Sequence, residues 1–216
     1  MDSKQVVEAI EQGKIMVIIR GKDYETLENI TDAIYKGGIR CCEVPFDSMG
    51  KTSDEQTADN ISKLVKKFPD MAIGAGTVLK ESQVELAAKA GAKFIVAPDV
   101  NCEVIKKTKE LNLVSIPGAL TPSEATLAHR TGADFVKLFP NGEMKDTYIK
   151  TLKVPLPFIK FIAFGGVYPH NLTQVLANGA TAVGVATGIV AKSSVESGKF
   201  EEITQNAKEY LAIING

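Results

Sequence analysis

Lys137 is unusual for its surroundings because it lies in the middle of GADFVKLFP (residues 132–140), an apolar segment typical of a buried strand. Burying an unpaired ammonium group is costly, and lysine is among the residues least often found inside a protein. One interpretation is that Lys137 lies near a strand end, reaches water and pairs with a carboxylate. The other is that desolvation lowers its pKa, so that the neutral amine acts as a nucleophile.

The segments around Lys137 alternate between two patterns. Short apolar runs, each typical of a strand buried on both faces as in a parallel sheet, begin at residues 14, 41, 71, 93, 113, 134, 159 and 181. Segments with apolar residues at helical spacing lie between them, for example at residues 24–38, 59–68 and 81–91. The sequence therefore predicts strands and helices in strict alternation.

Four glycines support this organisation. Gly38, Gly91, Gly132 and Gly179 each follow a helical stretch and precede a strand, where a left-handed residue ends the helix. They are 53, 41 and 47 residues apart, which is about two strand-helix units each. Eight units predict a single (β/α)8 TIM barrel over residues 1–216. A doubly wound open sheet is the alternative, but it normally has about five or six strands, and the GxGxxG pattern is incomplete after residues 74–76.

A barrel brings the carboxyl ends of its strands to one rim, where active sites of this fold lie. The residues that end the predicted strands are unusual for buried strands: Glu43, Thr77, Pro98, Pro117, Phe139, Gly165, Gly166 and Thr187. Each also has an ordinary explanation, such as a solvated charge, a strand-ending proline or tight packing at a glycine. The glycine pair before a predicted helix also suits backbone amides that converge on a phosphate.

Composition limits the classes of partner. The net charge is −1 and no basic stripe interleaved with aromatic residues is present, so nucleic acid is not an expected partner. No apolar run is long enough to span a membrane, and the polar amino terminus does not resemble a secretory signal, so we expect a cytoplasmic protein. Cys41, Cys42 and Cys102 are expected to be reduced and structural.

Several motifs stand at or near the predicted strand ends: EVPF with Glu43, GAGTV at 74–78, VAPD at 96–99, IPGALTPSE at 116–124, VKLFP at 136–140 and FGGV at 164–167. In order and spacing they resemble a known family, the bifunctional 2-keto-3-deoxy-6-phosphogluconate (KDPG) and 4-hydroxy-2-oxoglutarate (KHG) aldolases. The resemblance covers nearly the whole chain, and GAGTV and the Phe-Pro after Lys137 are its most distinctive parts. It implies a homotrimeric, metal-independent class I aldolase that cleaves 2-keto-4-hydroxy acids to pyruvate and an aldehyde.

The resemblance also implies roles for the rim residues. Lys137 would form a Schiff base with the 2-keto group, and Glu43 would move protons as base and then acid. Thr77 would orient the keto acid, while Pro98 and Phe139 would line its methyl side. Gly165, Gly166 and Thr187 would hold the distal phosphate or carboxylate.

Two residues depart from the family pattern. Many members carry an arginine shortly after the strand-two glutamate to bind the substrate carboxylate, but Asp47 occupies that region here, in a second loop that looks long. Arg20 matches an arginine that ends strand one in other members, and we expect it to take that role. Phe164 replaces the usual polar residue before the glycine pair. We expect Phe164 and Asp47 to weaken binding of a distal dianion without changing the lysine chemistry.

Two other functions remain open from the sequence. A barrel enzyme acting non-covalently on a phosphorylated substrate would keep the glycine pair but not need Lys137. A non-catalytic protein that binds keto acids or sugar phosphates would keep the pocket without turnover. We expect no cofactor and no metal, since His129 and His170 lie in different segments without ligand spacing.

Overall fold

One parallel sheet forms the centre of the protein. The computed structural model describes residues 1–21, 23–145 and 147–216. Within them, the strands are β1 (Ile15–Ile18), β2 (Cys41–Pro45), β3 (Ala72–Gly76), β4 (Phe94–Val96), β5 (Val114–Ile116), β6 (Gly118–Ala119), β7 (Val136–Leu138), β8 (Phe161–Phe164) and β9 (Ala182–Val185). Their order is β5-β4-β3-β2-β1-β9-β8-β7-β6, and every neighbouring pair is parallel.

The two ends of that order are consecutive pieces of the chain. β5 and β6 are interrupted only by Pro117, which has no amide hydrogen to give to a sheet. The Pro117 carbonyl nevertheless accepts a hydrogen bond from Lys137 N at 2.9 Å, and the Ser115 carbonyl accepts one from Phe135 N at 3.2 Å. These bonds close the sheet, so the predicted TIM barrel is confirmed, with the fifth predicted strand divided in two.

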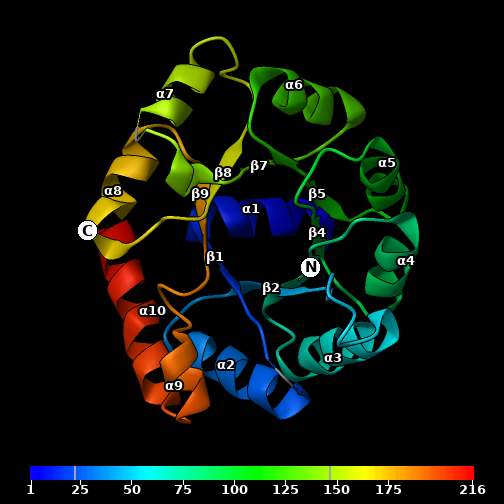
Figure 1. Ribbon diagram of the computed structural model, residues 1–216, viewed down its shortest axis with the longest axis vertical. Coiled ribbons are helices and arrows are strands. Elements are labelled where there is room, and N and C mark those ends of the chain that lie inside the picture. Colours follow the sequence, from blue (N-terminus) through cyan, green and yellow to red (C-terminus); the bar gives the residue numbers. More distant parts are fainter. Residues whose placement is uncertain (22, 146) are drawn as a thin grey trace.

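Helices pack around the barrel, and the first of them lies over its centre instead (Figure 1). They are α1 (Ser3–Gly13), α2 (Tyr24–Lys36), α3 (Asp54–Lys67), α4 (Glu81–Lys89), α5 (Cys102–Glu110), α6 (Pro122–Thr131), the 3-10 helix η1 (Asn141–Glu143), α7 (Tyr148–Lys153), α8 (Pro169–Ala177), α9 (Lys192–Glu196) and α10 (Phe200–Asn215). The predicted left-handed glycines Gly38, Gly91, Gly132 and Gly179 have φ values of 101°, 90°, 110° and 108°. They turn the chain from a helix back toward the barrel, as expected.

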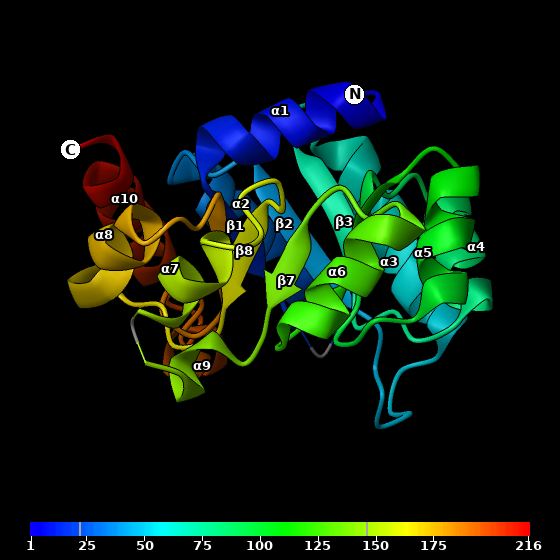
Figure 2. The same ribbon diagram turned by 90° about the horizontal axis from the view of Figure 1, so that it is seen from above.

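Two apolar clusters hold the barrel together. The larger cluster lies between the outer faces of the strands and the helices, and includes Ile34, Leu64 and Tyr210. The smaller fills the barrel interior, where Val6 and Ile10 of α1 pack with strand residues such as Phe94. α1 lies across one end of the barrel (Figure 2), so the opposite end, where the strands finish, is left for the loops.

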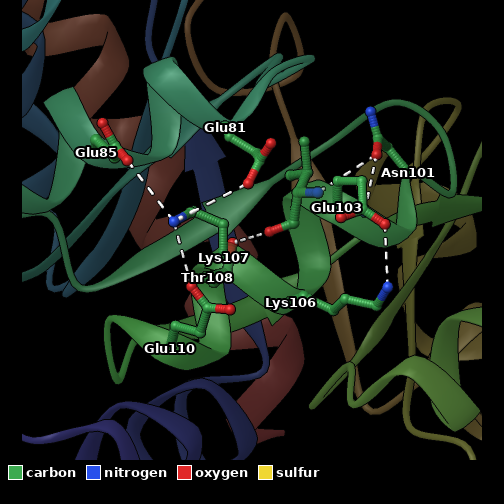
Figure 3. Close-up of polar contacts among 9 residues, drawn as sticks. Glu81, Glu85, Asn101, Glu103, Lys106, Lys107, Thr108 and Glu110 are labelled. Atoms are coloured by element: carbon green, nitrogen blue, oxygen red, sulfur yellow. Dashed lines mark hydrogen bonds and ion pairs between the residues drawn. The ribbon is translucent and has the colours of Figure 1, made fainter.

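The outer surface of α4 and α5 carries a network of charges (Figure 3). Lys107 lies within 4.0 Å of carboxylate oxygens of Glu81, Glu85 and Glu110, which come from both helices. Among the described residues, Lys106, the next residue, forms one ion pair, with Glu103 at 3.0 Å. The Lys107 network therefore joins two neighbouring helices, whereas the Lys106 pair stays within α5.

The helices and the cysteines bear on the expectations drawn from composition. No helix of the described residues is long and apolar enough to cross a membrane. All three cysteines are free, and Cys41 and Cys42 are buried. Burial raises the pKa of the Cys42 thiol, which agrees with a structural rather than a reactive cysteine.

Candidate active site

A cavity of about 300 Å³ opens at the carboxyl ends of the strands. The structure brings to it all nine residues that the sequence predicted as a site: Arg20, Glu43, Thr77, Pro98, Lys137, Phe139, Gly165, Gly166 and Thr187. A larger cavity of about 1000 Å³ shares Arg20 and Thr187 with it, but neither Lys137 nor Glu43 lines that one. The chemistry therefore belongs to the smaller cavity.

Lys137 comes from β7, and its side-chain nitrogen lies near two aromatic rings. Nζ lies 4.8 Å from the ring centroid of Phe139 and 4.7 Å from that of Phe164. Burial lowers the pKa of Lys137, the nearby Glu43 opposes this shift, and Arg20 adds to it. No salt bridge joins Lys137 to a carboxylate of the described residues, so the structure gives no support to the interpretation of Lys137 as half of an ion pair. Burial therefore makes the amine of Lys137 easier to deprotonate than that of an exposed lysine.

Glu43 comes from β2 and is buried, with 3% of its surface exposed. Its Oε2 atom has no hydrogen-bond partner among the described residues. Burial raises the pKa of Glu43 from its usual value to about 7, although the positive charges of Lys137 and Arg20 act in the opposite direction. At neutral pH this carboxyl group is able both to accept and to give a proton, as general acid-base catalysis requires.

Gly76 makes room for Glu43. A Cβ atom on Gly76, the last residue of β3, would lie 1.8 Å from Glu43 Oε2. The next residue, Thr77, has a φ of 52°, an unfavourable value for a β-branched residue. Hydrogen bonds on both sides hold the segment there, from Phe46 N to the Gly76 carbonyl and from Val78 N to the Val96 carbonyl. Such strain is typical of functional positions and places Thr77 on the cavity wall.

Arg20 follows β1 and is exposed at the cavity. Its guanidinium forms no ion pair with a carboxylate of the described residues. A guanidinium that faces a cavity without a protein partner suits a carboxylate ligand, which it binds through two parallel hydrogen bonds. The role of Arg20 in binding the substrate carboxylate stays a prediction.

Gly165 and Gly166 follow β8, and both have a positive φ, 85° and 67°. A Cβ on Gly166 would lie 2.4 Å from the Cα of Gly142, so no other residue fits without a backbone shift. The Asn171 side chain accepts a hydrogen bond from Tyr168 N and donates one to the Gly166 carbonyl, both at 2.8 Å. Thr187, after β9, lines the same side of the cavity.

Further cavity residues were not predicted as site residues: Ile18, Phe164, Val167, Tyr168, Gly184, Val185, Ala186 and Gly188. Phe164 departs from the family pattern, which has a polar residue at this position, and the structure shows what the aromatic ring contacts. Its ring fills the space beside Gly184, where a Cβ would lie 2.3 Å from the ring. A glycine inside an apolar strand is a signal of close approach, so Gly184 was detectable from the sequence. Tyr168 carried no comparable signal.

We expect from the sequence that Asp47 adds negative charge at the mouth of the site. In the structure, its carboxylate instead binds backbone amides of its own loop. The carboxylate accepts hydrogen bonds from the backbone nitrogens of Met49, Lys51 and Thr52. These bonds lower the pKa of Asp47, the Met49 amide most. Asp47 does not line the Lys137 cavity. It organises the loop between β2 and α3, which agrees with the long second loop that the sequence indicated.

The described residues contain no group of three or more histidine, cysteine, aspartate or glutamate side chains placed to hold a metal ion. The donors at the site are instead an amine, a carboxyl group, a guanidinium and backbone amides. That set suits covalent chemistry on a carbonyl compound with a negatively charged group.

Comparison with known sequences decides the family. The sequence model described as "Aldolase: KDPG and KHG aldolase" matches residues 6–206. The chain belongs to this family. It is therefore an aldolase, a lyase that acts on carbon-carbon bonds.

Individual members of the KDPG and KHG aldolase family are similar over most of their length. The chain is 31% identical to the 2-dehydro-3-deoxy-phosphogluconate aldolase of Haemophilus influenzae, over 98% of each chain. It is 35% identical to the 2-dehydro-3-deoxy-6-phosphogalactonate aldolase of Escherichia coli K12, over 84% of this chain and 87% of that one. A solved structure titled "Native KDPGal structure" superposes with a TM-score of 0.82 and 32% identity, covering 93% of this chain and 94% of that one.

Proposed function

We propose that this aldolase is a class I, Schiff-base enzyme that cleaves 2-keto-4-hydroxy acids such as KDPG or KHG to pyruvate and an aldehyde. The aldehyde would be glyceraldehyde 3-phosphate or glyoxylate. The observation that carries the proposal is the pairing, in one cavity, of a half-buried lysine of lowered pKa with a buried carboxyl group, one oxygen of which lacks a hydrogen-bond partner among the described residues. Family membership supports the aldol chemistry.

Lys137 would supply the electron sink. Its neutral amine attacks C2 of the keto acid, and loss of water from the carbinolamine gives an iminium ion. When the C3–C4 bond breaks, its electron pair moves toward the iminium and forms an enamine, while the C4 oxygen becomes the aldehyde carbonyl. The rings of Phe139 and Phe164 lie where they would stabilise the iminium cation.

Glu43 would move the protons in these steps. As a carboxylate it takes the C4 hydroxyl proton during cleavage, and as a carboxylic acid it returns a proton to the enamine carbon. Water then hydrolyses the iminium, which releases pyruvate and the free amine of Lys137. A pKa of about 7 suits a group that needs both forms in each turnover.

The remaining residues would bind the substrate. The free guanidinium of Arg20 would pair with the carboxylate next to the keto group, and Thr77 would orient the keto acid. Pro98 and Phe139 would contact the methyl side of pyruvate. Gly165, Gly166 and Thr187 would bind the distal phosphate or carboxylate through amides and a hydroxyl.

Steady-state assays on the candidate substrates test the proposal. We expect cleavage of both KDPG and KHG, with a preference for the phosphorylated substrate below about 10³-fold in kcat/KM, because Phe164 offers the distal group no polar contact. One similar protein is named as a phosphogluconate aldolase and another as a phosphogalactonate aldolase. The assay should therefore include both C4 epimers of the phosphorylated substrate. Pyruvate release is followed by coupling to lactate dehydrogenase.

Controls in that assay separate the competing functions. A chelator should leave the rate unchanged, and a large loss restored by a divalent ion would contradict the class I assignment. Binding without turnover of any 2-keto-4-hydroxy acid would favour a non-catalytic binding protein. Turnover that survives in Lys137→Ala would favour a barrel enzyme without a covalent intermediate.

We also propose that the protein is one domain, a homotrimer and cytoplasmic, and that it needs no cofactor. Val154 and Phe158 support association, because these large apolar side chains lie close in sequence and are 80% and 55% exposed. Light scattering should give a mass about three times the 23.2 kDa of the chain. The mass of a monomer would contradict the trimer.

A further inference from the structure

Two polar side chains of α10 reach the loops behind the cavity. The Tyr210 hydroxyl donates a hydrogen bond to the Val167 carbonyl at 3.1 Å, and Asn206 Nδ2 donates one to the Ile189 carbonyl at 3.2 Å. Since these residues are four positions apart, they lie on the same face of α10. The two carbonyls belong to different loops, which follow β8 and β9.

These loops carry the residues assigned above to the distal group of the substrate. Gly165 and Gly166 precede Val167, and Thr187 lies two residues before Ile189. α10 packs beside α8 at the edge of the barrel (Figure 1). Its two hydrogen bonds therefore connect one helix to both loops. Tyr210 and Asn206 are absent from the cavity wall, and their contacts reach the site only through the loops.

Tyr210 lies directly behind the wall. It is completely buried, and a Cβ on Gly188 would lie 2.2 Å from its hydroxyl oxygen. Gly188 itself lines the cavity. Only glycine at this position lets the hydroxyl approach so closely. Burial raises the pKa of Tyr210 to about 12, so the hydroxyl keeps its proton and donates over the whole range of an enzyme assay.

The hydrogen bonds of Tyr210 and Asn171 fix consecutive peptide units of the β8 loop. Tyr210 holds the Val167 carbonyl, while the N–H of the same peptide unit, at Tyr168, donates to Asn171 Oδ1. Asn171 also holds the Gly166 carbonyl, which turns the Val167 N–H in the opposite direction. Within the described residues, no hydrogen bond uses that Val167 N–H.

We propose that Tyr210 and Asn206 are positioning residues, through which α10 holds the β8 and β9 loops in the geometry that binds the distal anion of the substrate. This inference rests on the proposed function. Preorganised amides bind an anion better than amides that must first be ordered. Pyruvate has no distal group, so the chemistry at Lys137 should not depend on these two residues.

Tyr210→Phe tests the inference because it removes only the hydroxyl. We expect the KM for the phosphorylated substrate to rise about 10-fold while kcat changes little, the pattern of lost binding in the ground and transition states alike. Exchange of the pyruvate methyl protons with deuterium should stay within about 2-fold of the wild-type rate. Asn206→Ala should show the same selective loss through the other loop.

Tyr148→Phe is the matched control. The Tyr148 hydroxyl also donates to a backbone carbonyl, that of Leu120 at 2.7 Å, but Leu120 does not line the cavity. This variant should keep the wild-type KM. If Tyr210→Phe does not fold, as judged by circular dichroism, Asn206→Ala decides the question.

Two outcomes would overturn the inference. One is an unchanged KM in both α10 variants, and the other is an equal loss of substrate cleavage and pyruvate exchange, which indicates a purely structural role. A wild-type protein that neither exchanges pyruvate protons nor cleaves a keto acid would instead overturn the proposed function and the inference with it.

Discussion

Glu43 combines two properties that rarely occur together in a stable core. Its carboxyl group is buried, and one oxygen has no hydrogen-bond partner among the described residues. Buried polar atoms without partners are uncommon in proteins, since each costs free energy of folding. The site keeps this arrangement because a carboxyl group of raised pKa is the group that acid-base catalysis at neutral pH needs.

The catalytic role of Glu43 predicts a specific defect in Glu43→Gln. The amide has nearly the same shape but transfers no proton, so exchange of the pyruvate methyl protons with deuterium should slow by about 10² to 10⁴-fold. The variant should still form the pyruvate adduct at Lys137. Proton NMR in deuterium oxide measures the exchange, and a near-normal rate would move the role to another residue or to water.

The raised pKa of Glu43 also predicts a pH-dependent stability difference. Between about pH 4.5 and 7 the unfolded chain loses the Glu43 proton while the folded chain retains it, so the contribution of Glu43 to the wild-type free energy of unfolding falls as pH rises. Glu43→Gln lacks this loss. Relative to wild type, the variant should therefore gain about 3 kcal/mol between pH 4 and pH 8.

Urea unfolding at both pH values measures that difference. Glu8→Gln, which alters an exposed glutamate on α1, is the control and should follow the wild-type pH dependence. A constant difference between Glu43→Gln and wild type would contradict the raised pKa of Glu43.

At the scale of single residues, the sequence predicted most of the site because the chemistry is carried by unusual residue types. A lysine or glutamate in an apolar strand is visible without a structure. The structural role of Asp47 could not be predicted from the sequence, because the three hydrogen bonds that its carboxylate accepts depend on the path of its own loop. Tyr210 was also not visible, since a tyrosine in an amphipathic helix indicates only packing.

At the scale of elements, periodicity and the four helix-ending glycines were enough to predict the alternation of strands and helices. The division of the fifth strand was not predicted, although Pro117 was noted as a strand end. The reason is that Pro117 loses a donor but keeps its acceptor, so the sheet continues through its carbonyl to Lys137 N. The closure of the barrel depends on this long-range pairing, and no local pattern encodes it.

The charges between α4 and α5 lead to a prediction at this scale. Lys107→Met removes the cation shared by three carboxylates and leaves those acids to repel one another (Figure 3). We expect the Tm to fall by about 2 °C at low salt, and by less at high salt, where surface charges are screened. Differential scanning calorimetry measures both values.

Lys106→Met is the matched control, since the neighbouring lysine pairs with one carboxylate of its own helix. Its Tm should change less than that of Lys107→Met. Equal changes in the two variants would show that the network between the helices adds nothing to the pairs within them.

At the scale of the whole molecule, the barrel gathers residues that lie far apart in the sequence. The site takes Arg20 from the loop after β1, Lys137 from β7 and Thr187 from the loop after β9. The amino-terminal helix α1 lies across the opposite end of the barrel (Figure 2). The interior below the site is filled with apolar side chains, which contribute to the desolvation of Lys137 and Glu43.

The central claim is that the amine of Lys137 forms a Schiff base, and borohydride reduction in the presence of pyruvate tests it most directly. The reduced protein should gain the mass of one pyruvyl group, and peptide mass spectrometry should place it on Lys137. Lys137→Ala should keep its fold but gain no such mass and lose turnover. Absence of the adduct in the wild type, or its presence on another lysine, would contradict the mechanism.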